Sequence, residues 1–198
     1  VGASLSLRRP LRAYEMAPLV SGGQDKIVAY SVEGTPADSS VLALESLVGP
    51  VDLVVSGINQ GSNLGEDVLI SGTVGAAFQG YVRGYPAVAI SVGAITDTRF
   101  EVASAFLHLL GIGLAQGSPL PATLMNVNIP NEPIEAIEGV QVTRLGRRSY
   151  SESVTSEQDG KHTYYKINRG TAVYQQEEQA EGTDTWALLH KNISVTPL

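Results

Sequence analysis

The sequence contains no cysteine and few basic residues. Without cysteine the protein has no disulfide, no thiolate metal ligand and no cysteine nucleophile, so any metal ion must be held by oxygen or nitrogen atoms. The same absence fits a reducing compartment, and we expect a cytoplasmic protein. Thirteen Lys and Arg residues against twenty Asp and Glu residues leave a formal net charge of −7. No excess of positive charge is available to neutralise the phosphates of a long nucleic acid, so we expect no such partner.

Long hydrophobic runs are also missing. The longest apolar stretch, residues 102–115, is interrupted by Ser104 and His108 and is shorter than the ~20 residues needed to span a bilayer, so we expect no membrane partner. The chain starts without Met and without a secretory signal pattern. Residues 1–7 already alternate like the inside of a folded element, and residues 193–198 stop as abruptly. We therefore expect the natural chain to continue at both ends.

Short apolar runs alternate with helical patterns over most of the chain. Its length of 198 residues and its 43% apolar content suit a single globular domain. Strands are predicted at residues 27–32, 52–55, 86–92, 123–129 and 140–145, and helices at 36–47, 74–84 and 99–114. The first helix has a clear start, because Thr35 can cap it, Pro36 suits its first position and Asp38 favours its dipole. The alternation predicts an α/β fold with a Rossmann-like parallel-sheet core.

Residues 148–198 differ from the rest of the chain. Up to residue 182 they are polar, lack a helical pattern and contain Asp159-Gly160, a turn signal for a β-hairpin. A short helix capped by Thr183 or Asp184 and a strand at 193–196 are predicted to follow. We therefore divide the chain into a core, residues 1–147, and a β-hairpin with a C-terminal extension, residues 148–198.

A glycine-rich loop, residues 56–70, carries the best candidates for a binding site, because ligands of open α/β sheets lie beyond the carboxyl ends of the strands. Asn59 offers a side-chain oxygen of the kind that Mg²⁺ or Mn²⁺ accepts, so it is a candidate metal ligand. Asn63 lies further along the loop. The tripeptide Ser71, Gly72 and Thr73 opens the next helix, and a helix start with free N–H groups is a ready phosphate site.

A purely structural interpretation of this loop stays open. The asparagines and hydroxyls could cap turns and a helix, and the glycines could supply positive φ angles. The adjacent Glu66 and Asp67 are interpreted as solvated loop acids. Familiar catalytic signatures are absent from the sequence: it has no G-x-x-x-x-G-K-[ST] motif and no G-x-S-x-G elbow, and its three histidines do not form an H-x-x-x-H pair.

Residues 52–80, DLVVSGINQGSNLGEDVLISGTVGAAFQG, resemble the signature of the SurE family of survival-protein nucleotidases. Three further stretches agree with this family in the same order, namely VGASLSL at 1–7, GTPAD at 34–38 and EGTDTWALLHKNISVTPL at 181–198. The resemblance thus covers essentially the whole chain. It implies a Rossmann-like core whose β-hairpin and C-terminal extension make dimer or tetramer contacts. It also implies a divalent-metal-dependent phosphatase that acts on nucleoside 5′- and 3′-monophosphates.

The resemblance further implies roles for individual residues. Asn59 matches the family's metal-binding asparagine, with Mg²⁺ or Mn²⁺ as the cofactor. The phosphate-contacting positions of the family match Asn63, Ser71, Gly72 and Thr73. The remaining metal ligands of the family are an Asp-Asp pair, which would precede Val1, and a serine at the position that Val1 occupies. Ile70 stands where the family usually has Tyr.

One neutral asparagine cannot supply the about six oxygen ligands of such a cation, so we expect the 198 residues alone to bind metal poorly and to be inactive. The intact protein is expected to be about 40 residues longer at the front, by the size of one βαβ unit. Its implied reaction is hydrolysis by a metal-activated water while the helix start holds the phosphate, in a homodimer or homotetramer. The competing interpretation is a non-catalytic nucleotide- or phosphate-binding α/β module, and a third is an oligomeric scaffold with a structural loop.

Overall fold

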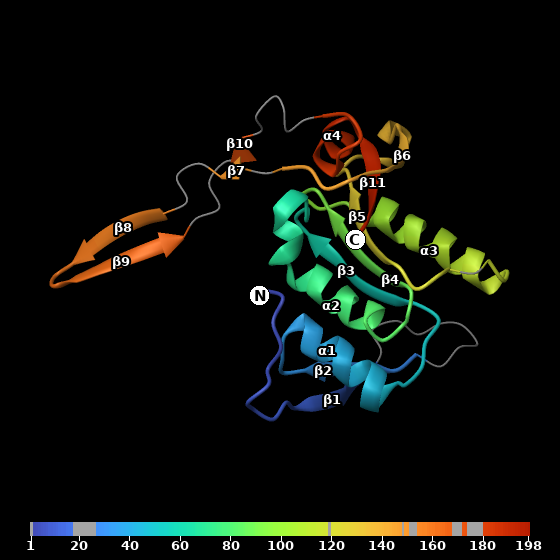
Figure 1. The fold of residues 1–198 in the computed structure, drawn as a ribbon, viewed down its shortest axis with the longest axis horizontal. Coiled ribbons are helices and arrows are strands. Elements are labelled where there is room, and N and C mark those ends of the chain that lie inside the picture. Colours follow the sequence, from blue (N-terminus) through green and yellow to red (C-terminus); the bar gives the residue numbers. More distant parts are fainter. Residues whose placement is uncertain are drawn as a thin grey trace.

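The computed structural model describes residues 2–17, 27–118, 120–147, 149–150, 154–167, 172–173 and 180–198. A five-stranded sheet in the order β3-β4-β5-β11-β6 forms the centre (Figure 1). Its strands are β3 (Val54–Gln60), β4 (Ala87–Val92), β5 (Leu124–Ile129), β11 (Asn192–Pro197) and β6 (Gly139–Val142). The helices are α1 (Pro36–Leu42), α2 (Gly72–Tyr81), α3 (Glu101–Ala115) and α4 (Asp184–Leu189), with shorter helical turns at Ala43–Leu47, Gly65–Leu69 and Ile134–Ala136. This architecture confirms the α/β class. Within the described residues no helix is both long and apolar enough to cross a membrane.

The central sheet contains the predicted parallel core, and the C-terminal extension makes it a mixed sheet. The strands β3, β4 and β5 run parallel, but β11 runs antiparallel to β5 and parallel to β6. The strand predicted at 27–32 also lies outside this sheet. It is β2 (Ala29–Val32), which pairs antiparallel with β1 (Ala13–Met16). The physical reason is that an apolar run predicts a strand but does not show which strand pairs with it.

The strand β4 is covered on both faces, which explains its uninterrupted apolar sequence. All six of its residues are buried. Ile90 belongs to the cluster that contains Val102 of α3, whereas Ala89 belongs to the opposite cluster with Ala77 of α2. The helix α2 approaches the sheet closely, because a Cβ at Gly80 would lie only 2.7 Å from the side chain of Val54. Packing therefore holds α2, and with it the first residues of that helix, in a fixed place against the sheet.

The start of α1 is held by a reciprocal capping contact, as the sequence predicts. Thr35 Oγ1 accepts a hydrogen bond from the N–H of Asp38 at 3.1 Å, and the Asp38 carboxylate accepts from the N–H of Thr35 at 2.8 Å. The same carboxylate accepts from the N–H of Ser6 at 2.8 Å, which ties the N-terminal segment to α1. Burial opposes the ionisation of Asp38, but the hydrogen bonds from Ser6 and Thr35 outweigh it and lower its pKa to about 2.

We expect Asp38→Asn to lower the free energy of unfolding at neutral pH by about 1 to 2 kcal/mol, the usual size of a capping contribution. The folded pKa of about 2 lies below the unfolded value near 3.8. The stabilisation by the carboxylate is therefore complete above the unfolded pKa and is lost as the pH falls through the folded pKa. Urea unfolding at neutral pH and at a pH near the folded pKa measures the loss of unfolding free energy in Asp38→Asn. The exposed Asp52→Asn is the control. A difference from wild type that stays constant over this range would contradict the assignment.

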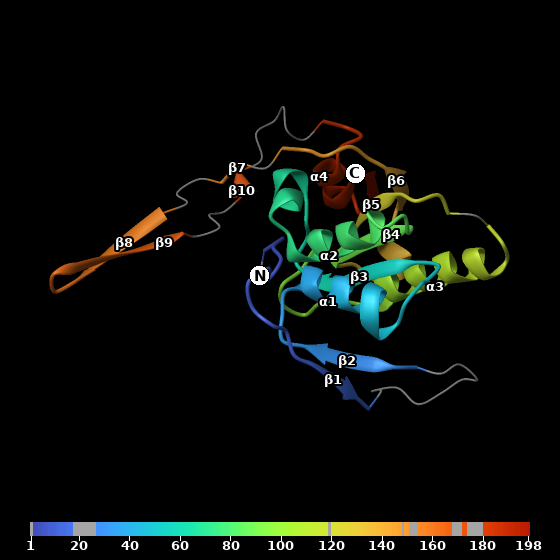
Figure 2. The same ribbon diagram turned by 60° about the horizontal axis from the view of Figure 1, so that its bottom comes forward.

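A hairpin arm extends away from the body in both ribbon views (Figures 1 and 2). Its strands β8 (Val154–Asp159) and β9 (His162–Ile167) pair antiparallel, with Asp159 opposite His162. Gly160 has a φ of +58° in the turn between them, as the Asp159-Gly160 signal predicts. A shorter pair, β7 (Ser149–Tyr150) with β10 (Ala172–Val173), lies at the base of the arm. The predicted hairpin is confirmed, and its role in oligomer contacts stays a prediction.

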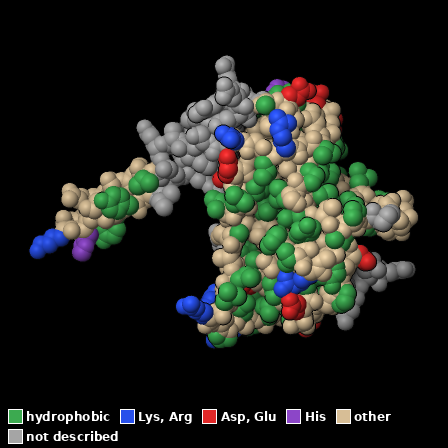
Figure 3. Space-filling model, viewed as in Figure 1, with side chains coloured by type: hydrophobic (Ala, Val, Ile, Leu, Met, Phe, Trp, Pro, Cys, Tyr) green, Lys and Arg blue, Asp and Glu red, His purple; other side chains and the backbone are tan. Residues whose placement is uncertain are grey.

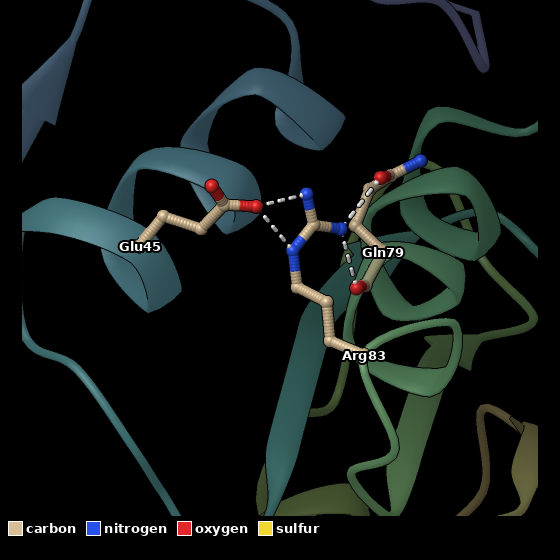
Figure 4. A network of polar contacts seen from close by, with 3 residues as sticks. All are labelled: Glu45, Gln79 and Arg83. Carbon is tan, nitrogen blue, oxygen red and sulfur yellow. Dashed lines mark hydrogen bonds and ion pairs between the residues drawn. The ribbon is translucent and has the colours of Figure 1, made fainter.

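Arg83, just after α2, reaches the helical turn that extends α1 (Figure 4). Its Nη2 and Nε donate to Glu45 Oε1 at 2.6 and 2.8 Å. Its Nη1 donates to the side-chain and main-chain oxygens of Gln79 at 3.0 and 2.9 Å. Because the Glu45 side chain is exposed, the ion pair contributes at most about 1 kcal/mol. The attachment of α1 to α2 therefore depends chiefly on packing.

Candidate functional site

The strand β3 leads into the candidate loop through a bulge at Gly57. The pairing of β3 with β4 changes register between Ser56 and Asn59. Gly57 has a φ of +134°, and a side chain there would overlap the carbonyl oxygen of Ile90, so only glycine fits. After the bulge, Asn59 pairs with Ser91 near the end of β4. The bulge thus carries β3 to residue 60, beyond the predicted end at residue 55, and places Asn59 at the carboxyl edge of the sheet.

Asn59 is half-buried and uses its side-chain nitrogen to shape the loop. Its Nδ2 donates to the main-chain oxygens of Gln60 at 3.1 Å and Gly61 at 2.7 Å. These bonds confirm the turn-capping role of the structural interpretation. They also leave the Oδ1 atom as the part of the side chain that can bind a ligand.

The described residues do not complete a divalent-cation site around Asn59. Among them no group of three or more His, Cys, Asp or Glu side chains is placed to hold a metal ion. A Mg²⁺ ion takes about six oxygen ligands and is usually bound through one or two carboxylates, so one amide oxygen does not fit this requirement. Val1, which the resemblance aligns with a serine ligand, lies outside the described residues. The described residues therefore offer one candidate ligand atom, Asn59 Oδ1, beside hydrogen-bond donors and acceptors.

Asn63 is buried and is held by polar side chains of β4 and β5. Its Nδ2 donates to Ser91 Oγ at 2.7 Å, and its N–H donates to Asn128 Oδ1 at 2.9 Å. Its carbonyl oxygen accepts from the Nδ2 atoms of Asn126 and Asn128 at 2.8 and 3.0 Å. Among the described residues no hydrogen bond joins Asn63 to the start of α2. The structure thus shows a role in holding the loop, and phosphate contact by Asn63 stays a prediction.

The start of α2 has the geometry of an anion site. Ser71 is buried and caps the helix, with its Oγ accepting from the N–H of Val74 at 3.2 Å, as the sequence predicts. Within the part of the chain that the structure describes, nothing accepts a hydrogen bond from the N–H of Thr73. N–H groups at the positive end of a helix of this length attract an anion.

The N-terminal segment lies against this helix start. Gly2 forms a β-bridge with Ser71, and the N–H of Ala3 donates to the carbonyl oxygen of Ile70 at 3.2 Å. A Cβ at Gly75 would lie 2.9 Å from the Cβ of Ala3, so glycine permits this close approach. Residues 2 and 3 therefore form one wall beside the first turn of α2.

Asp184 holds the candidate loop from a third direction. It is fully buried, its Oδ2 accepts from the N–H of Gly65 at 2.9 Å, and its Oδ1 accepts from the N–H groups of Gly146 at 2.7 Å and Thr185 at 2.8 Å. Burial raises the pKa of Asp184, whereas these N–H donors act in the opposite direction. One side chain thereby joins the loop, the segment after β6 and the start of α4.

Sequence reasoning did not identify four residues that hold the loop: Ser91, Asn126, Asn128 and Asp184. The first three lie in segments that were interpreted as buried apolar strands, and all four are fully buried. A signal was available, because a polar side chain inside a buried strand must find a hydrogen-bond partner. That signal does not say which segment supplies the partner.

An apolar cavity of about 570 Å³ lies beside α2. Its lining includes Leu5, Leu7, Leu69, Phe78, Tyr81 and Leu198. Neither Asn59 nor Ser71 lines this cavity. Apolar side chains also cover much of the face drawn in Figure 3. We place the candidate site at the polar loop rather than in the cavity, because a phosphate ester needs hydrogen-bond donors.

Comparison with known proteins finds relatives along the whole chain. A family model described as survival protein SurE matches residues 1–152. The 5′-nucleotidase SurE of Carboxydothermus hydrogenoformans is 43% identical over 100% of this chain and 74% of its own length. The 5′-nucleotidase SurE of Legionella pneumophila is 40% identical over 98% of this chain and 73% of its own length. The crystal structure of the SurE protein from Aquifex aeolicus superposes with a TM-score of 0.79 at 37% identity, covering 100% of this chain and 77% of that one.

Proposed function

The chain belongs to the SurE family, and from this membership we propose that it is a nucleotidase, a hydrolase that releases phosphate from nucleoside 5′-monophosphates. The observation that supports this most directly is the start of α2. There Ser71 caps the helix, and the N–H of Thr73 faces no acceptor among the described residues. A phosphate monoester is the anion that suits such a helix start.

The chain's own residues contribute binding and charge stabilisation. The N–H groups of Gly72 and Thr73 would donate to the non-bridging oxygens of the phosphate, next to the positive end of the α2 dipole. These donors are fixed by packing before the substrate arrives, so they stabilise negative charge that grows on the oxygens as water attacks phosphorus. No covalent nucleophile is required in this proposal.

We extend the proposal to nucleoside 3′-monophosphates, because the candidate donors would contact the phosphate and not the sugar. A divalent cation, Mg²⁺ or Mn²⁺, would supply Lewis acidity, and Asn59 Oδ1 would be one of its ligands. The described residues offer no carboxylate cluster to complete the ligand set of this cation. The proposed assembly is a homodimer or homotetramer, with the exposed arm as the element that contacts another copy.

The alternative is a module that binds phosphate or a nucleotide without hydrolysing it. The start of α2 is compatible with it, because a helix start could capture an anion without any metal. Phosphate release separates the two functions. Protein expressed from its full reading frame should release phosphate from a panel of nucleoside monophosphates with Mg²⁺ or Mn²⁺, and a chelator should stop the release. Folded protein that binds phosphate but releases none with any metal would support the binding module.

Asn59→Ala is expected to lower metal-dependent phosphate release by at least about tenfold, because it removes the candidate ligand oxygen. The same substitution removes the hydrogen bonds to Gln60 and Gly61, so a second variant is needed. Asn59→Asp keeps an oxygen at this position and loses the nitrogen donor. If Asn59 is a ligand, the aspartate variant responds to Mn²⁺ in a titration of activity and the alanine variant does not. Equal losses in both variants would show that only the capping bonds matter.

A further inference from the structure

Polar side chains of β5 bind the candidate loop in the manner of a neighbouring strand. Asn128 contacts both main-chain polar groups of Asn63, accepting from its N–H at 2.9 Å and donating to its carbonyl oxygen at 3.0 Å. Asn126 donates to the same carbonyl oxygen at 2.8 Å. Both asparagines are fully buried. Because the bonds are buried, water does not readily replace any bond that is lost.

The contact lies on the segment between Asn59 and Ser71, nearer to Asn59. The loop leaves the sheet after Gly61, whose N–H still donates to the carbonyl oxygen of Val92 at 3.0 Å. The amides of Asn126 and Asn128 then hold it at Asn63, and Asp184 holds it at Gly65. The path of the chain toward the start of α2 is therefore set by side chains that belong to the sheet and to α4.

We propose that Asn128 is a positioning residue of the phosphate site, with Asn126 as its weaker partner. Asn128 supplies two bonds to Asn63, whereas Asn126 supplies one and its Oδ1 has no partner among the described residues. The bonds fix the part of the loop that joins the end of β3 to the start of α2. The expected effect on phosphate rests on the proposed function, but the effect on the loop does not.

The test compares Asn128→Ala with Val127→Ala. Val127 precedes Asn128 in β5, is fully buried, and belongs to the cluster on the α3 side, so its truncation is a matched perturbation of the opposite face. Amide hydrogen exchange, read by mass spectrometry on peptides covering 61–70, should be faster in Asn128→Ala by about tenfold or more, since two buried hydrogen bonds are lost. Val127→Ala should leave this segment within about twofold of wild type.

Titration with inorganic phosphate is the second readout. Asn128→Ala should bind phosphate about tenfold more weakly than wild type, and Val127→Ala should bind it as wild type does. Equal exchange rates at 61–70 in Asn128→Ala and wild type, or equal acceleration in both variants, would overturn the positioning role. If wild type itself binds no phosphate, the proposed anion site fails, and the exchange rates still decide the role of Asn128.

A variant with a smaller change covers the case in which Asn128→Ala does not fold. Asn126→Ala removes a single bond to Asn63 and should accelerate exchange at 61–70 about threefold, with no acceleration in peptides of α3. If residues 61–70 of Asn126→Ala exchange at the same rate as in wild type, the proposal is overturned.

Discussion

Gly72→Pro is expected to reduce phosphate release at least about 100-fold, the usual size of the effect when one main-chain or side-chain donor to a developing oxyanion is removed. Proline has no N–H, so the variant loses one of the two proposed donors at the start of α2. A helix tolerates proline at its first position. Ser71 already has an extended backbone, with a ψ of 127°, as a residue before proline prefers. Steady-state kcat/KM for a nucleoside monophosphate measures the loss.

Gly72→Ala is the matched control, because it adds a side chain at the same position and keeps the N–H. The alanine variant should retain most of the activity, and both variants should keep a cooperative thermal transition. A proline variant with activity near wild type would remove this N–H from the site. Equal losses in the two variants would assign the effect to the added side chain instead of the missing donor.

Local signals in the sequence correctly predicted local structure. Thr35, Pro36 and Asp38 predicted the start of α1, and the capping contact has the expected partners. Asp159 and Gly160 predicted the turn of the arm. The strand at 27–32 was predicted as a strand but assigned to the wrong sheet, because its pairing with β1 depends on a chain reversal that the apolar pattern does not encode.

In the candidate site too, local contacts could be predicted from the sequence and long-range contacts could not. The helix cap at Ser71 and the turn contacts of Asn59 are local. The structural interpretation of the sequence included both a helix cap and a turn cap. The residues that hold the loop come from far away in the sequence. Gly65 is separated by 119 positions from Asp184, and Asn63 by 65 from Asn128. Composition and spacing show that a buried polar side chain needs a partner, but only the folded sheet brings the partner to it.

We expect Asp184→Ala to lower the free energy of unfolding by about 3 kcal/mol or more, a large effect for one side chain. The substitution deprives the buried N–H groups of Gly65 and Gly146 of the acceptor that they share, and each such loss amounts to about 1 to 3 kcal/mol. Burial raises the pKa of Asp184, which reflects an unfavourable desolvation of the carboxylate. That desolvation offsets part of the hydrogen bonding, so the expected loss lies near the lower end of the summed range.

Urea unfolding measures this loss, with the exposed Glu181→Ala as a control that should stay within about 0.5 kcal/mol of wild type. Asp184→Asn keeps the shape of the side chain and changes its hydrogen bonding. The amide keeps one acceptor oxygen and turns a nitrogen donor toward one of the N–H groups. Its stability should fall between wild type and the alanine variant. Since the contact with Gly65 lies on the path from Asn59 to Ser71, Asp184→Asn should also weaken phosphate binding while the protein stays folded. An alanine variant as stable as the Glu181 control would show that the three joined segments are held by packing alone.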